Sequence, residues 1–224
     1  MAAKMAAASF LITYQGRDYT WCPAKSTPSV GKPITELSEI VKILKKRKAK
    51  SIVDFGAGRG RNLRIIASSF TKVRLVEQGR NIAYLRGLIA KRKAASVTVE
   101  SWQHYRIHES PKVDAILICF VIHTVPSERL RREIIQANVA RLRESGTIVF
   151  VTPRNDPKYK PKVLADAVQF RDGIVRLYNG DMTFSFYRNY LSKDFARLIG
   201  INGLRVDATI PSARRMIFIT EHEK

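Results

Sequence analysis

The feature that most constrains the fold is a strand-like run followed at once by three alternately spaced glycines. Residues 51 to 55 read Ser-Ile-Val-Asp-Phe, and Gly56, Gly58 and Gly60 follow with one residue between neighbours. A helical pattern of apolar residues begins directly afterwards, over 63 to 66. Glycine suits such a turn because the turn needs unusual backbone angles, and because a ligand can lie against bare main chain at the positive end of a helix. The sequence therefore predicts a strand, a tight turn, a helix and a nucleotide-like ligand at the turn.

The spacing of these glycines separates three kinds of ligand site. A dinucleotide fingerprint, Gly-x-Gly-x-x-Gly, would place its third glycine at position 61, where this chain has Arg61. A phosphate-binding P-loop would end in Gly-Lys-Ser or Gly-Lys-Thr, and neither tripeptide is present. The pattern Asp54-x-Gly56-x-Gly58-x-Gly60 instead resembles the first motif of the class I S-adenosylmethionine-dependent methyltransferases. Because ordinary strand-to-helix turns also use glycine, the neighbouring elements must decide.

An acidic residue at the end of the next predicted strand supports the methyltransferase resemblance. The second strand is predicted over 72 to 77, and it places Glu77 19 residues after Gly58. A carboxylate at this point can accept hydrogen bonds from both hydroxyls of a ribose. The alternative interpretation is that Glu77 is a solvated charge at the end of a strand.

The rest of the chain alternates between helical and strand-like patterns. Helices are predicted over 37 to 44 and 79 to 93, from Ser127 to Gly146, and up to Gly200. Further strands are predicted over 96 to 100, 113 to 121, 146 to 151, 204 to 210 and 216 to 220. This order predicts an α/β fold with a doubly wound, mostly parallel sheet. The resemblance extends it to a seven-stranded sheet with a C-terminal antiparallel hairpin, the Rossmann-like methyltransferase fold.

A chain of 224 residues suits one domain with a substantial core. We expect an N-terminal arm over 1 to 34 and a methyltransferase domain over 35 to 224, with a basic and aromatic insertion at about 154 to 190. The arm could cover a ligand pocket or only the edge of the domain. The insertion could hold a base and its phosphates, or be a hairpin whose aromatic residues form a small core.

The resemblance also implies roles for particular residues. Gly56 and Gly58 would approach the methionine part of S-adenosylmethionine with their backbone, Asp54 would orient its amino group, and Glu77 would hold its ribose. Adenine contacts would follow the third strand. The expected cofactor-binding residues are Asp54, Phe55, Gly56, Gly58, Glu77, Gln78, Glu100, Ser101, Trp102 and Phe120.

A single residue is the candidate for catalysis. His123 follows the fourth strand, where the resemblance places the transferred methyl group, so it is the candidate catalytic base or acceptor contact. A histidine in such a loop more often serves packing or the entry into the next helix. No metal site is expected.

Charge bears on the methyl acceptor. The chain has 40 Lys and Arg against 19 Asp and Glu, a net charge of +21, which predicts attraction to a polyanion unless it only solubilises the surface. Arg59, Arg61 and Arg64 lie beside the glycine turn, and a lysine-rich run from Lys42 to Lys50 exceeds what a helix end requires. We therefore favour an anionic acceptor: RNA, DNA or a phosphorylated molecule. The alternatives are a small molecule or protein side chain as acceptor, and a non-catalytic basic protein that binds nucleic acid.

Cysteine usage indicates the compartment. The chain has two cysteines, Cys22 in a proline-bearing loop and Cys119 inside the predicted fourth strand. This pattern favours a reducing, cytoplasmic protein without a disulfide framework or zinc cluster. The apolar run within residues 1 to 12 is too short for a membrane span, and no transmembrane segment is expected. The sequence makes no prediction of oligomeric state.

Overall fold

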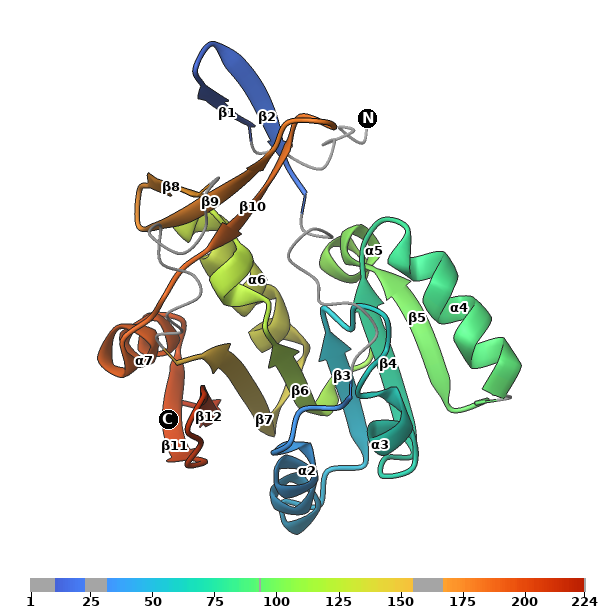
Figure 1. Cartoon of the computed structure of the whole chain (residues 1–224). Coiled ribbons are helices and arrows are strands. Elements are labelled where there is room, and N and C mark those ends of the chain that lie inside the picture. The colour runs from blue at the N-terminus through green and yellow to red at the C-terminus, as the bar shows by residue number, and fades with distance from the viewer. Residues whose placement is uncertain (1–10, 23–31, 93, 155–166, 224) are drawn as a thin grey trace.

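The computed structural model describes residues 11–22, 32–92, 94–154 and 167–223. A seven-stranded sheet forms its centre, in the order β11-β12-β7-β6-β3-β4-β5 (Figure 1). Its first five strands along the chain pair in parallel, and β12 pairs in antiparallel fashion with both β7 and β11. The bounds are β3 (Ser51–Phe55), β4 (Lys72–Glu77), β5 (Val97–Ser101), β6 (Val113–Cys119), β7 (Leu142–Pro153), β11 (Leu204–Thr209) and β12 (Arg215–His222). The predicted fold class is confirmed.

Helices cover both faces of this sheet. They are α2 (Leu37–Lys46), α3 (Leu63–Ala67), α4 (Asn81–Arg92), α5 (Trp102–Ile107), the 3-10 turn η1 (Ile122–Thr124), α6 (Glu128–Arg141) and α7 (Ser192–Gly200). The core divides accordingly: α2, α3 and α4 supply one hydrophobic cluster, and α5, α6 and α7 supply the other. Strand β6 lies between them with Ala115 to Ile118 at most 1% exposed, which explains the apolar run that follows Asp114.

A second, smaller sheet lies beyond the carboxyl ends of the parallel strands (Figure 1). Its order is β1-β2-β10-β9-β8, with bounds β1 (Leu11–Tyr14), β2 (Arg17–Trp21), β10 (Thr183–Tyr187), β9 (Gly173–Tyr178) and β8 (Ala167–Phe170). Strands from the expected arm and from the expected insertion thus belong to one sheet, because β2 pairs in parallel with β10. Tyr19, Phe184 and Phe186 are buried together there, as the small-core interpretation of the aromatic residues requires.

One buried arginine joins this second sheet to the main body. Arg131 of α6 is only 1% exposed, and it donates hydrogen bonds to the Tyr190 hydroxyl (2.9 Å) and to Asp172 (2.6 Å), which lies between β8 and β9. Arg188 also pairs with Asp172, and its backbone N–H donates to the His123 carbonyl at 2.8 Å. The second sheet is therefore attached to the loop that carries the candidate catalytic residue.

Several element boundaries differ from the sequence prediction, most by one or two residues, and two differences have a clear structural cause. We expected Gly146 to end a helix and to begin a strand, which is wrong: α6 ends at Arg141 and β7 begins at Leu142. Residues 143 to 146 form a bulge, since Leu142 pairs with Val113 and the next pair is Thr147 with Ala115. A Cβ on Gly146 would lie 2.6 Å from Cγ of Leu142, so the glycine is required by packing within the bulge.

The second difference is at the end of the fourth strand of the parallel series. We expected that strand to continue to Val121, but β6 ends at Cys119. Phe120 leaves the strand with a φ of +60°, a left-handed conformation that ends the strand. None of the described helices is long and apolar enough to cross a membrane.

Candidate active site

The glycine turn joins β3 to α3 at the carboxyl edge of the sheet. The N–H groups of Gly56 and Ala57 both donate to the Val76 carbonyl, at 2.8 and 3.2 Å. The Gly58 N–H donates to Oε2 of Glu77 at 2.5 Å. These bonds attach the turn to the end of β4, so the predicted partners Gly58 and Glu77 are in contact.

Gly56 is required by its neighbour as well as by the backbone, and Gly60 is closely packed. Gly56, Gly58 and Gly60 have φ values of +74°, +59° and +73°, which L side chains rarely adopt. A Cβ on Gly56 would lie 2.3 Å from the Val121 side chain, and a Cβ on Gly60 would meet Leu85 and Leu88 of α4 at 3.1 Å. Part of the glycine pattern thus serves close packing of the turn, independently of any ligand.

Asp54 is buried at the base of the turn, and the neighbouring polar groups of Arg61 and Asn62 do not reach its carboxylate with normal hydrogen-bond geometry. Its side chain is 1% exposed, and neither carboxylate oxygen accepts a hydrogen bond in the described part of the chain. Burial raises the pKa of Asp54 from 3.8 to about 7, although nearby Arg61 and Asn62 oppose this shift. A buried acceptor without a partner is costly, so this position favours a ligand that brings a positively charged donor.

Glu77 is fixed by backbone groups on both of its oxygens. Besides the bond from Gly58, its Oε1 accepts from the Gln78 N–H at 2.9 Å. Burial raises the pKa of the Glu77 carboxyl, and these two hydrogen bonds oppose the rise. A carboxylate has about four lone-pair directions, so two remain for a diol.

Aromatic side chains gather beside the carboxyl ends of β3 and β5. Phe55 is 5% exposed, and the half-buried Trp102 meets it edge to face with 5.1 Å between ring centroids. Tyr105 of α5 lies behind both rings. Ser101 caps α5, because its Oγ accepts from the His104 N–H at 3.1 Å. The structure therefore brings Phe55 and Trp102 together, while the Ser101 hydroxyl is already used locally.

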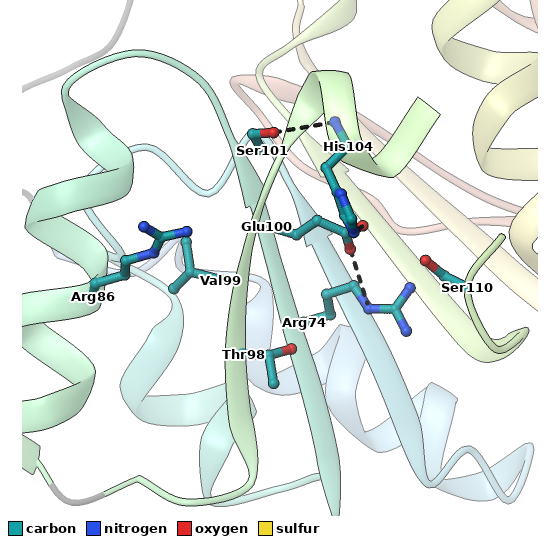
Figure 2. Close-up of a pocket in the computed structure, with 8 residues that line it drawn as sticks. All are labelled: Arg74, Arg86, Thr98, Val99, Glu100, Ser101, His104 and Ser110. Atoms are coloured by element: carbon teal, nitrogen blue, oxygen red, sulfur yellow. Dashed lines mark hydrogen bonds and ion pairs between the residues drawn. The ribbon is translucent and has the colours of Figure 1, made fainter. Parts of the chain in front are cut away.

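The Glu100 side chain, on the edge strand β5 of the sheet, is paired with basic residues. Glu100 pairs with Arg74 (3.5 Å) and His104 (3.6 Å). Figure 2 shows these three side chains on one side of β5, with Arg86 on the other side, around a surface cavity of about 470 Å³. A contact between Glu100 and adenine stays a prediction, and the observed ion pairs do not support it.

Phe120 and His123 lie where β6 ends. Their rings are 5.9 Å apart, and the His123 ring is 6.3 Å from that of Tyr187 in β10. His123 is only 4% exposed, so its side chain lies beneath the second sheet. The Arg61 guanidinium stacks on Phe120 at 4.8 Å. Sequence reasoning noted Arg61 only for its charge and did not single out Tyr187, since no local pattern brings β10 to this loop.

Cys119, directly before Phe120, has the environment of a core residue. Its thiol is 5% exposed, and burial raises its pKa to about 12. A thiol of this kind is a poor nucleophile, because the thiolate is the reactive form.

The fold is that of the class I S-adenosylmethionine-dependent methyltransferases. One similar structure is an S-adenosylmethionine-dependent methyltransferase from Clostridium acetobutylicum, with TM-score 0.68, 11% identity, and 84% of this chain and 91% of that chain covered. Another is the CcbJ methyltransferase from Streptomyces caelestis, with TM-score 0.64, 13% identity and coverage of 90% and 95%.

A third similar structure is the 1,6-didemethyltoxoflavin-N1-methyltransferase of Burkholderia thailandensis, with S-adenosylhomocysteine bound. It has TM-score 0.63, 13% identity, and 85% of this chain and 79% of that chain covered. No protein-family model matches the sequence, and no curated protein matches it. At sequence identities this low, the similarity to these structures establishes the fold alone.

Proposed function

We propose that this chain transfers a methyl group from S-adenosylmethionine to a small organic molecule. The observation that carries the proposal is Asp54: a buried carboxylate that accepts no hydrogen bond with normal geometry from the described residues, at the base of a glycine turn in this fold. An ammonium group would give it the missing partner, and the methionine part of S-adenosylmethionine carries one.

The residues at the turn fit the rest of this cofactor. Glu77 would accept hydrogen bonds from the two ribose hydroxyls, since its carboxylate is oriented by Gly58 and Gln78. Trp102 would pack against adenine, with Phe55 supporting its ring. When bound, the cofactor supplies an electrophilic methyl group on a sulfonium sulfur.

The protein would contribute alignment and proton removal. Phe120, His123 and Tyr187 would form an aromatic wall for the acceptor at the end of β6, and holding the reacting groups in line supplies much of the catalysis. His123 is the proposed proton acceptor.

The acceptor we favoured from the sequence, a nucleic acid or phosphorylated molecule, rested on net charge. The similar structures favour the alternative, because the acceptor named for the Burkholderia enzyme is a small molecule and others are described as amino pentose and sugar methyltransferases. We therefore place a small molecule first.

Calorimetric titration with S-adenosylmethionine and S-adenosylhomocysteine tests the proposal. We expect the folded wild type to bind both, and Asp54→Asn and Glu77→Gln to weaken each by at least about tenfold, the loss of one charge-assisted hydrogen bond. Glu144→Gln is the matched control, because Glu144 is an exposed carboxylate in the β7 bulge. Absence of binding to folded wild type would remove the basis for the proposal.

A second experiment tests the acceptor. Purified protein and cofactor with a labelled methyl group are incubated with a cell extract, which is then separated into small-molecule, nucleic-acid and protein fractions. Label in the small-molecule fraction, lost in the His123→Ala variant, supports the proposal. Label confined to nucleic acid would restore the acceptor favoured from the sequence.

A further inference from the structure

A group of exposed positive charges lies at the edge of the sheet opposite to the glycine turn. Parallel strands all begin at one edge, so the end of α2 and the starts of β3, β4 and β6 meet there, at the lower end of the view in Figure 1. Six exposed lysines, which we call the amino-edge lysines, lie on these segments: Lys45, Lys46, Lys48, Lys50, Lys72 and Lys112. Between Ser51 and Phe55, β3 spans about 13 Å, which separates this edge from the turn.

Backbone contacts bring these segments together. The Lys72 N–H donates to the Lys50 carbonyl at 3.3 Å, and the Lys50 N–H donates to the Asp114 carboxylate at 2.9 Å. Asp114 also accepts from Ser51 and pairs with Arg143, so its charge is already balanced. The amino-edge lysines therefore form a continuous border along the starts of neighbouring strands.

The fold does not use these lysines as ion-pair partners. Among the described residues, none of the six forms an ion pair. Arg47, within the same run, behaves differently: it donates to Thr147 Oγ1 at 3.2 Å and pairs with Asp207 and Glu221. Arg47 thus connects the end of α2 to other strands of the sheet, whereas the side chains of the neighbouring lysines are exposed to solvent.

The helix end does not account for the lysines either. A helix C-terminus carries about half a negative charge, which Lys45 and Lys46 in the last turn already match. Lys48 follows the C-cap with a φ of +61°, at the position where helices usually have glycine. Neither an ion pair nor a backbone preference therefore explains a lysine at this position.

We propose that the amino-edge lysines bind the phosphate backbone of double-stranded nucleic acid, independently of base sequence and of the methyl acceptor. A border of point charges suits phosphates, and the segments expose no aromatic side chain on which single-stranded bases could stack. An acidic membrane is disfavoured, because the large exposed apolar residues (Leu11, Tyr84, Ile107, Leu191 and Ile201) all lie on other segments.

Fluorescence anisotropy with two short DNA duplexes of unrelated sequence tests the proposal. The test variant is Lys45→Gln, Lys46→Gln, Lys48→Gln and Lys50→Gln together. The matched control, Arg17→Gln, Arg106→Gln, Lys193→Gln and Arg197→Gln, removes the same charge from exposed positions on β2, α5 and α7. Thermal unfolding checks that both variants are folded.

We expect the wild type to bind both duplexes equally, with affinity falling steeply with salt. In the test variant, the slope of log affinity against log salt should become shallower by about 3 to 4, roughly 0.9 for each phosphate that the variant no longer neutralises. Affinity at about 100 mM NaCl should fall more than tenfold, and the control should stay close to wild type. Equal weakening of both variants, no binding by folded wild type, or tighter binding to phosphatidylserine vesicles than to DNA would overturn the proposal.

Discussion

Replacing Asp54 by asparagine should stabilise the ligand-free protein at high pH while weakening cofactor binding. Burial raises the pKa of Asp54 from 3.8 to about 7, so the folded state holds a proton between these values that the unfolded state has released. Stability contributed by this residue is therefore lost as pH rises from about 4 to about 7. At about 1.4 kcal/mol per pKa unit, the ionised carboxylate lowers the free energy of unfolding at pH 8 by up to about 4 kcal/mol.

Urea unfolding at pH 5 and pH 8 measures this effect. Asparagine does not titrate, so its amide changes the free energy of unfolding by the same amount at both pH values. The stability of Asp54→Asn relative to wild type should be greater at pH 8 than at pH 5 by about 3 kcal/mol. Glu144→Gln, at an exposed site, should show no such difference. If Asp54→Asn is equally stable relative to wild type at both pH values, Asp54 is not a buried acceptor awaiting a donor, and the argument for the cofactor fails.

Three further substitutions test the packing described above, each by urea unfolding. Gly56→Ala should destabilise by about 2 to 4 kcal/mol, because its Cβ would lie 2.3 Å from Val121 and its φ is +74°; Gly79→Ala, also at positive φ but in open space, should cost only about 1 kcal/mol. Lys48→Gly should stabilise by about 1 kcal/mol by relieving the left-handed conformation, whereas Lys42→Gly inside the same helix should destabilise by a similar amount. Arg131→Ala should cost about 3 kcal/mol or more, because it leaves buried polar groups unpaired, while the exposed Arg129→Ala should change stability by less than about 0.5 kcal/mol.

The sequence predicted the main sheet well because each parallel strand carries a local signal. Apolar runs such as the one that follows Asp114 in β6 reflect burial on both faces, and glycine marked the turn that approaches Glu77. The β7 bulge was missed because Gly146 looks like a helix end when the register with β6 is unknown. The ion pair of Glu100 with Arg74 was not predicted, because the two residues lie on different strands.

The second sheet left no comparable signal in the sequence. Its central contact is the parallel pairing of Trp21 with Phe184, two residues far apart in the chain. Tyr187 contacts His123, and Asp172 accepts a hydrogen bond from Arg131 of α6. Both contacts depend on the position of the second sheet, which this pairing and the Arg131 contacts fix. A local sequence pattern indicates how a residue contributes to its own helix or strand. These residues instead make contacts between different helices and strands, which no local pattern indicates.

The construction of the second sheet affects how acceptor preference could be altered. Because β2 and β10 share one ladder of hydrogen bonds, two segments that are far apart in the sequence jointly form the sheet that contacts His123. A chimaera that exchanged only residues 167 to 187 with another methyltransferase would leave β2 beside a strand it was not selected to pair with. Recombination or directed evolution at this site would have to exchange the amino-terminal hairpin and the distant three-stranded segment as one inherited unit.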